Sequence, residues 1–140
     1  MQETKRRFII SLFLTSFTVT GFSQTINVND SFFKARVQTF TNEVFLNCPL
    51  FTDSIYVVEN AEIMSRIELI TENYQPSETY KPLSAILLKN KCNSALTRDE
   101  LNFNPANFNP LKYFLNWYPI TLTKYRVDNS NYVIVVHPKS

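Results

Sequence analysis

Glycine is almost absent from this chain, and its absence limits the turns and loops that the chain can form. The single glycine, Gly21, lies close to the N-terminus, so residues 24–140 contain none. Average usage of roughly 7% would place about eight glycines in a segment of that length. Dinucleotide-binding loops, phosphate-binding loops and the nucleophile elbow of α/β-hydrolases need glycine where the backbone turns sharply or approaches a ligand. The sequence therefore excludes these three classes of site.

Turns in this chain must be built from asparagine and proline instead. Asn tolerates the left-handed backbone region and can bond its own backbone, while Pro fixes φ inside a turn. The Asn-Pro pairs at 104–105 and 109–110 predict tight turns. The polar run at 128–131 lies between two β-favouring runs and predicts a hairpin.

The first residues of the chain have the pattern of a secretory signal peptide. Three basic residues at 5–7 precede an uncharged, mostly apolar stretch at 8–22. Small residues, Gly21 and Ser23, occupy positions −3 and −1 before a cut. The apolar stretch has 15 residues and would be about 22 Å long as a helix, whereas a bilayer-spanning helix needs about 20 residues. We therefore expect a cleaved signal peptide at 1–23 rather than a retained membrane anchor.

Cleavage at this point leaves residues 24–140, a length typical of one globular domain. It would remove three of the 14 basic residues and one of the 12 acidic residues, so the remaining part carries no formal net charge. Without a basic cluster to meet phosphates, we expect no nucleic-acid partner. We expect a secreted or periplasmic domain that has no membrane span after signal cleavage.

The two cysteines, Cys48 and Cys92, predict one disulfide. In an oxidising compartment a pair of this kind often forms a bridge. The alternative is two separate buried thiols that act as small apolar side chains. No Cys-x-x-Cys spacing is present, so a redox enzyme is not expected.

One strongly periodic helix follows the predicted cut. Apolar residues recur at spacings of four, three and four and form one face: Phe33, Val37, Phe40 and Val44. Asn29 or Asp30 can cap this helix, which we expect to extend to about Asn47. Pro49 prevents it from continuing.

The rest of the chain favours strands. Residues 54–66 are ambiguous between a short β-favouring piece and a helical turn. Strands are predicted at 66–72, at 83–91 with helix as the alternative, at 111–117, at 125–127 and at 132–136. The last is almost entirely apolar and is expected at the centre of the sheet. Thr97 and Glu100 fit a capping box for a short helix.

Together these elements predict an α+β fold. We expect one or two helices packed on one face of a four- or five-stranded antiparallel sheet, with a C-terminal β-hairpin. No linker or change of composition divides residues 24–140, so we expect a single domain.

No local motif for catalysis or metal binding is present. His137 is the only histidine, whereas a zinc site needs three or four clustered ligands. Asp99 and Glu100 would point in different directions on a helix and fit stabilisation of its N-terminus better than catalysis. We expect no metal and no cofactor. A hydrolase site would have to be assembled from separate segments, using Asp53, Glu59, Asp99, Asp128 and His137.

A cluster of aromatic residues is the clearest candidate for binding. Six fall within sixteen residues: Phe103, Phe108, Tyr113, Phe114, Trp117 and Tyr118. Tyr and Trp combine a flat apolar face with a polar tip and are enriched at interfaces. We take Tyr113, Trp117 and Tyr118 as candidate binding residues. The alternative places the cluster in the core, with Tyr113 and Trp117 on one face of a strand.

We therefore expect a small exported, non-catalytic domain that binds a protein or a glycan, in the manner of an inhibitor or an immunity protein. Two alternatives stay open. A small extracytoplasmic hydrolase would show a concave pocket that holds titratable groups. A structural component of the envelope would show an exposed apolar patch or a free strand edge.

The predicted signal peptide is directly testable. Because the small residues precede position 24, we expect the exported protein to begin at Gln24, within a residue or two. N-terminal sequencing of the exported protein measures this. An exported protein that still carried Met1 would contradict the prediction and the compartment inferred from it.

Overall fold

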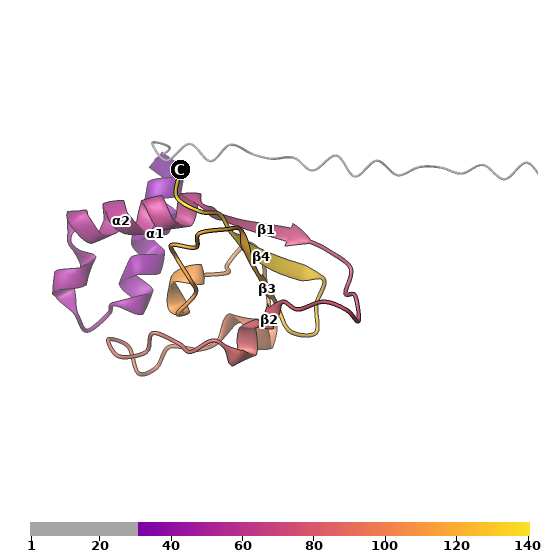
Figure 1. Cartoon of the computed structure of the whole chain (residues 1–140). Helices are drawn as coiled ribbons and strands as arrows, with labels where there is room; N and C mark the ends of the chain where they lie inside the picture. Colours follow the sequence, from indigo (N-terminus) through magenta and orange to yellow (C-terminus); the bar gives the residue numbers. More distant parts are fainter. Residues whose placement is uncertain (1–30) are drawn as a thin grey trace, which may run out of the picture.

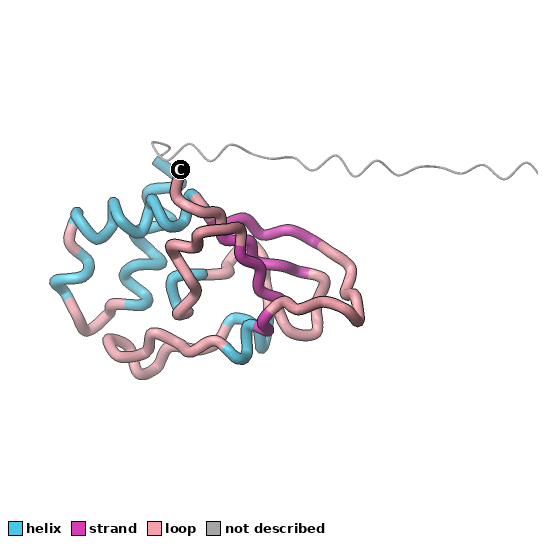
Figure 2. The backbone as a smooth tube through the Cα atoms, in the orientation of Figure 1, coloured by secondary structure: helices cyan, strands magenta, loops and turns pink. Residues whose placement is uncertain are grey.

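Two helices and a four-stranded sheet form the fold, which confirms the α+β class (Figures 1 and 2). The structure is a computed structural model that describes residues 31–140. The predicted signal peptide and the helix caps Asn29 and Asp30 lie outside these residues. The main elements are α1 (Ser31–Val44), α2 (Ser54–Ser65), β1 (Ile67–Thr71), β2 (Lys81–Pro82), β3 (Thr123–Arg126) and β4 (Tyr132–Val136). Four short 3-10 helices connect them: η1 (Pro49–Thr52), η2 (Leu83–Ala85), η3 (Asp99–Asn102) and η4 (Pro110–Lys112).

Helix α1 forms where the apolar periodicity predicts it. Val37, Phe40 and Val44 are buried along one face, together with Thr41. The helix ends at Val44, and residues 45–47 form a turn rather than a last helical turn. Asn47 instead donates its N–H to the carbonyl of Cys92, 3.0 Å away.

Helix α2 is one continuous element, although the sequence left residues 54–66 ambiguous. The Asp53 carboxylate accepts the N–H of Ser54 at 2.6 Å and so caps the helix start. Packing against α1 adds a tertiary contact, since Asn60 Nδ2 donates to Thr41 Oγ1 at 3.0 Å. The cap and this packing outweigh the β-favouring run that follows Ser54.

The sheet has the order β1-β4-β3-β2 and is mixed. Strand β4 lies between β1 and β3 and is antiparallel to both, with Val136 opposite Ile67 and Thr123. Strands β3 and β4 form the predicted C-terminal hairpin, in which Asn129 has a positive φ of 54°. The expectation of an entirely antiparallel sheet is wrong, because the two-residue strand β2 pairs in parallel with β3. Pro82 has no N–H to donate, which suits this short edge strand.

Loops, rather than helices, cover the main apolar face of the sheet. The buried cluster on this face contains Leu83, Ile86, Phe108, Tyr113, Leu115, Tyr125, Val127, Ile134 and Val136. Its members come from β3 and β4, from Val127 directly after β3, and from the chain between 83 and 115. The helices pack against each other and against Leu111 in a second cluster, at one end of the sheet (Figure 1). The expected layer of helices on one sheet face is therefore replaced by a layer of loops.

The strands predicted at 83–91 and 111–117 are reduced to one contact. Leu88 and Tyr113 form an isolated antiparallel bridge, flanked by short 3-10 helices. The predicted capping box is also absent, since η3 begins after Arg98 without a side-chain cap. Glu100 points into the protein instead, where it accepts a hydrogen bond from the Tyr113 hydroxyl at 2.6 Å.

A loop from β1 is bound to the sheet by charged groups. Arg126 of β3 donates from Nε and Nη2 to the two carboxylate oxygens of Glu78, and from Nη1 to the carbonyl of Glu72 at 2.6 Å. Lys124 donates to the Glu72 carboxylate at 2.8 Å and to the Tyr80 hydroxyl at 3.0 Å. These contacts hold the chain between β1 and β2 against β3.

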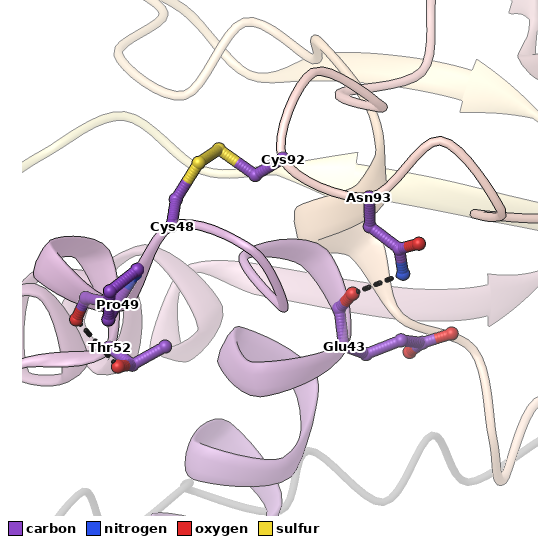
Figure 3. The surroundings of a disulfide bond; sticks show 6 residues. All are labelled: Glu43, Cys48, Pro49, Thr52, Cys92 and Asn93. Atoms are coloured by element: carbon purple, nitrogen blue, oxygen red, sulfur yellow. Dashed lines mark hydrogen bonds between the residues drawn. A yellow bond between two sulfur atoms is a disulfide. The ribbon is translucent and has the colours of Figure 1, made fainter.

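Cys48 and Cys92 form the predicted disulfide (Figure 3). The bridge joins the turn after α1 to the long loop that precedes η3, across a sequence separation of 44. Beside it, Asn93 Nδ2 donates to the carbonyl of Glu43 in α1 at 2.8 Å. The disulfide and this hydrogen bond together attach the loop layer to the helices.

Removal of the disulfide is expected to destabilise the fold. On the chain-entropy account, opening a loop of this length lowers the free energy of unfolding by about 4 kcal/mol. Urea unfolding of a Cys48→Ala/Cys92→Ala variant, compared with the oxidised protein, measures the loss. Reductant should destabilise the natural chain and leave the variant unchanged. Equal stability of the oxidised protein and the variant would contradict the prediction.

Candidate binding surface

Tyr113, the first candidate binding residue, is completely buried in the core. Its hydroxyl donates to Glu100 and accepts the N–H of Asp99 at 2.7 Å. Burial, together with the hydrogen bond to Glu100, raises the pKa of the Tyr113 hydroxyl, which therefore stays neutral. Tyr113 has no exposed surface with which to contact a partner, so it lies in the core, as the alternative interpretation of the aromatic cluster expected.

Trp117, the second candidate, lies half-buried at the rim of the core. Its indole packs against the sheet cluster on one side. On the other side, Lys89 Nζ lies 4.9 Å from the centre of the Trp117 ring and 5.6 Å from that of Phe114. Trp117 thus belongs both to the core and to the surface beside it.

Tyr118, the third candidate, has 59% of its surface exposed. The Arg66 guanidinium lies over its ring, 5.2 Å from the ring centre. Arg66 Nη1 also donates to the carbonyl of Trp117 at 2.6 Å and to that of His137 at 3.2 Å. The backbone next to Tyr118 is therefore fixed by Arg66, which lies between α2 and β1, while the tyrosine ring is mostly exposed.

Other exposed apolar side chains lie near these residues in the chain or across the Leu88–Tyr113 bridge, and we call the whole group the aromatic surface. We define it by its side chains: Leu87, Phe114, Trp117, Tyr118, Ile120 and Leu122. Ile120 is 98% exposed and Leu87 is 74% exposed. Phe114 donates its N–H to the carbonyl of Leu87 at 3.0 Å, next to the Leu88–Tyr113 bridge. The bridge places Leu87 and Phe114 opposite one another on adjacent strands of chain, so they share a face.

Lys89 gives this surface an unusual electrostatic character. No ion pair involves Lys89 within residues 31–140, and its ammonium group lies against two aromatic rings. Burial lowers the pKa of Lys89 from its ordinary value. The ring faces stabilise the cation but do not neutralise its charge. The aromatic surface therefore carries a positive charge that no carboxylate of this part of the chain balances.

A second group of exposed apolar residues lies on α2, on η1 and in the turn before η1, and sequence reasoning missed it. Five of its exposed residues are Leu46, Leu50, Phe51, Ile55 and Val58. A shallow hollow of about 280 Å³ is lined by Ser54, Ile55, Val58 and Glu59. The sequence of α2 held a signal for this surface, because its apolar residues are spread around the helix and one buried face cannot hold them all. In the structure Met64 is the one buried residue of α2.

The residues proposed for a hydrolase do not gather in one site. Asp53 caps α2, and Asp128 accepts hydrogen bonds from the N–H and hydroxyl of Ser84. Asp99 binds Lys112, His137 lies 3.1 Å from Glu68, and Glu59 lines the hollow on α2. Among residues 31–140 no group of three or more His, Cys, Asp or Glu could hold a metal ion. Each side chain of this set thus sits in a different environment.

Among residues 31–140, the most concentrated cluster of charges surrounds Lys112, which is buried, while the Glu43 side chain is 40% exposed. Lys112 Nζ lies 2.5 Å from Asp99 and 2.7 Å from Glu43. Burial opposes the charge on Lys112, but the hydrogen bonds to Asp99 and Glu43 outweigh burial and raise its pKa. Asn109 completes the cluster by donating to Glu43 at 2.8 Å. Because its charges pair with one another across α1 and η4, the cluster has the features of a structural element.

The chain was compared with protein-family models, with curated proteins and with solved structures, and no match was found. Within residues 31–140, no helix has the length and apolarity needed to cross a membrane.

The two tyrosines at 113 and 118 offer a test of this description. Tyr113→Phe removes a hydroxyl that serves two buried polar groups, so we expect a loss of about 1–3 kcal/mol in the free energy of unfolding. Tyr118→Phe is the matched control, and its exposed ring predicts a change within about 0.5 kcal/mol. Urea unfolding measures both. Similar losses in the two variants would contradict the buried and exposed positions.

Proposed function

We propose that this chain is an exported, non-catalytic domain that binds a partner protein through the aromatic surface, as an inhibitor or immunity protein does. The observation that carries the proposal is the exposure of Phe114, Tyr118 and Ile120 on a backbone that the fold holds in place. Monomeric proteins seldom expose large apolar side chains in a continuous patch unless the patch is used.

The rigidity of the surface supports a binding role. Arg66 holds the carbonyl of Trp117, and the Leu88–Tyr113 bridge holds the backbone beside Phe114. Side chains that are already positioned lose less conformational entropy when a partner binds. Tyr and Trp at the centre of such a surface are the residue types that most often dominate interface energies.

Export is supported from two sides. The predicted signal peptide would direct the chain out of the cytosol, and disulfides such as Cys48–Cys92 persist in oxidising compartments. A secreted or periplasmic location therefore remains part of the proposal.

A protein partner fits the surface better than a glycan. Leu87, Ile120 and Leu122 are aliphatic and exposed. Leu87 lies opposite Phe114 across the bridge, and the other two follow Tyr118 closely in the chain. Aliphatic side chains gain most from burial against other apolar side chains. A glycan that stacks on the Tyr118 or Trp117 ring is the alternative partner.

The α2 surface favours a second candidate, a structural component of the envelope that is held by assembly. Its exposed apolar residues, such as Leu50 and Ile55, lie on a different part of the chain from the aromatic surface. The two roles therefore depend on different side chains.

Two pairs of variants distinguish these functions. Tyr118→Ala/Ile120→Ser alters the aromatic surface, and Ile55→Ser/Val58→Ser alters the α2 surface, with exposed residues changed in both cases. For a partner captured from the exported fraction, we expect the first pair to weaken binding at least about 30-fold, since hot-spot residues cost ~2 kcal/mol or more. We expect the second pair to leave that binding unchanged. Isothermal titration with the purified partner measures both.

Three other outcomes would count against a protein-binding aromatic surface. Equal retention of the partner by the natural chain and the Tyr118→Ala/Ile120→Ser variant would show that the aromatic surface is not used. Loss of self-association in the Ile55→Ser/Val58→Ser variant, measured by sizing across dilutions, would support the structural role instead. Binding of a glycan rather than a protein by the aromatic surface would support the alternative partner.

A further inference from the structure

Within the described part of the chain, the Arg66 guanidinium is hydrogen-bonded through one of its three nitrogens only. Its Nη1 donates to the carbonyls of Trp117 and His137. Its Nε and Nη2 are buried and have no hydrogen-bond partner among residues 31–140. Buried N–H groups are nearly always paired in folded proteins, so two unpaired ones on a single side chain call for an explanation.

Arg126 shows what such an arginine does in the same fold when its partner is present. Its Nη1 also donates to a backbone carbonyl, that of Glu72. Its Nε and Nη2 form a fork that holds both carboxylate oxygens of Glu78. This two-bond geometry is specific to a planar group with two oxygens. Arg66 presents the same fork without a carboxylate in it.

Glu62 is the nearest acidic side chain, and it does not fill the fork. Its Oε1 is 3.9 Å from Arg66 Nε, beyond hydrogen-bond distance. The same oxygen lies 2.9 Å from Lys139 Nζ. The hydrogen bond from Lys139 is the main reason that the pKa of Glu62 is lowered. Glu62 is therefore already bound to another cation.

The empty fork lies next to the aromatic surface. The Tyr118 ring stacks on the Arg66 guanidinium, and only 11% of the Arg66 side chain is exposed. The Tyr118 ring is itself mostly in solvent, so its rotation away from the guanidinium loses little packing, and access of a partner to Arg66 requires such a movement. Leu122 lies at the same end of the sheet, because Thr123 and Ile67 are both paired with Val136.

We propose that Arg66 Nε and Nη2 receive a carboxylate from the bound partner, at the edge of the aromatic surface. The partner is an acidic protein segment, in which an Asp, a Glu or a C-terminal carboxylate adjoins apolar side chains. This inference rests on the proposed function, because it assigns partner chemistry to the same surface. Lys89, which has no ion-pair partner within residues 31–140, gives a second positive charge for such a segment.

The surroundings favour a carboxylate over a phosphate group. Glu62 lies close to Arg66, and Glu68 lies 3.1 Å from the neighbouring His137. These negative charges disfavour a dianion more than a group with a single charge. The exposed aliphatic residues of the aromatic surface favour a protein segment over a uronic acid of a glycan, since they gain from apolar neighbours.

Nuclear magnetic resonance of the labelled exported domain can test the fork without an identified partner. Sodium acetate is the probe, and sodium chloride at equal ionic strength is the reference. We expect the Arg66 Nε–Hε signal to move and to saturate at millimolar acetate. The signal of Arg126 should stay in place because its fork is full. The signal of Arg36 should also stay, since its only unpaired buried atom is Nε and it offers no fork.

A conservative variant separates the fork from its charge. Arg66→Lys retains the positive charge and removes the two-bond geometry. Followed through the Tyr118 backbone amide, acetate binding should be at least about tenfold weaker in Arg66→Lys than in the natural chain. An Arg66 signal that moves no further in acetate than in chloride would overturn the proposal. So would a shift seen only in Glu62→Gln, because Glu62 would then be the occupant.

The source of the carboxylate and the proposed function are tested separately. A short peptide with alternating acidic and apolar residues should move the Arg66 signal at a lower concentration than a glucuronate oligosaccharide does. A lower concentration for the oligosaccharide would overturn the assignment to protein. If the partner bound the natural chain and Arg66→Lys equally, but not Tyr118→Ala/Ile120→Ser, the carboxylate site would fail and the binding function would stand.

Discussion

The ion cluster around Lys112 is the interaction on which the loop layer depends. Neither α1 nor α2 contributes to the buried cluster on the main apolar face of the sheet, so within residues 31–140 the chain between 83 and 115, with its short 3-10 helices, covers this face. Irregular chain carries backbone polar groups that regular elements would otherwise satisfy. Asn109 donates to the carbonyl of Phe40 at 3.1 Å, and its own N–H reaches Asp99 at 2.8 Å. Through these bonds and the two ion pairs of Lys112, the cluster joins the loop layer to α1 and makes it a stable cover.

The same cluster determines which side chains reach the solvent. The chain is fixed at Asn109 and Lys112, and then at Tyr113 by its hydroxyl and its bridge to Leu88. Because the backbone beyond this point is extended, alternate side chains turn inward and outward. Leu115 joins the core while Phe114 is exposed. The Lys112 cluster and the bridge thus position the backbone from which Phe114 projects.

The fold could be predicted where the signal was local. The apolar period of α1, the turn residues before β4 and the cysteine pair each depend on neighbouring residues or on compartment, and the structure has all three elements. The loop layer could not be predicted. Asn and Lys are residue types that are usually exposed, and Asn109 and Lys112 are buried here because they bind Glu43, which is distant in the sequence. The alternation expected for a strand at 111–117 correctly placed Tyr113 inward, although the structure has only an isolated bridge there. The fork of Arg66 had no sequence signal, since it depends on Trp117 and His137, which lie 51 and 71 residues away.

A formal balance of charge in residues 24–140 conceals an uneven distribution of partners. In the loop layer and the sheet, Lys112, Arg98 and Arg126 are each paired with carboxylates. At the aromatic surface, Lys89 is stabilised by ring faces, and Arg66 has a ring and two carbonyls on its filled sides. Ring quadrupoles and carbonyl dipoles stabilise a cation without cancelling its charge. The aromatic surface thus combines exposed apolar side chains with two cations that no carboxylate of residues 31–140 hydrogen-bonds, since Glu62 lies 3.9 Å from Arg66. A partner that brings both apolar side chains and a carboxylate would complement both features.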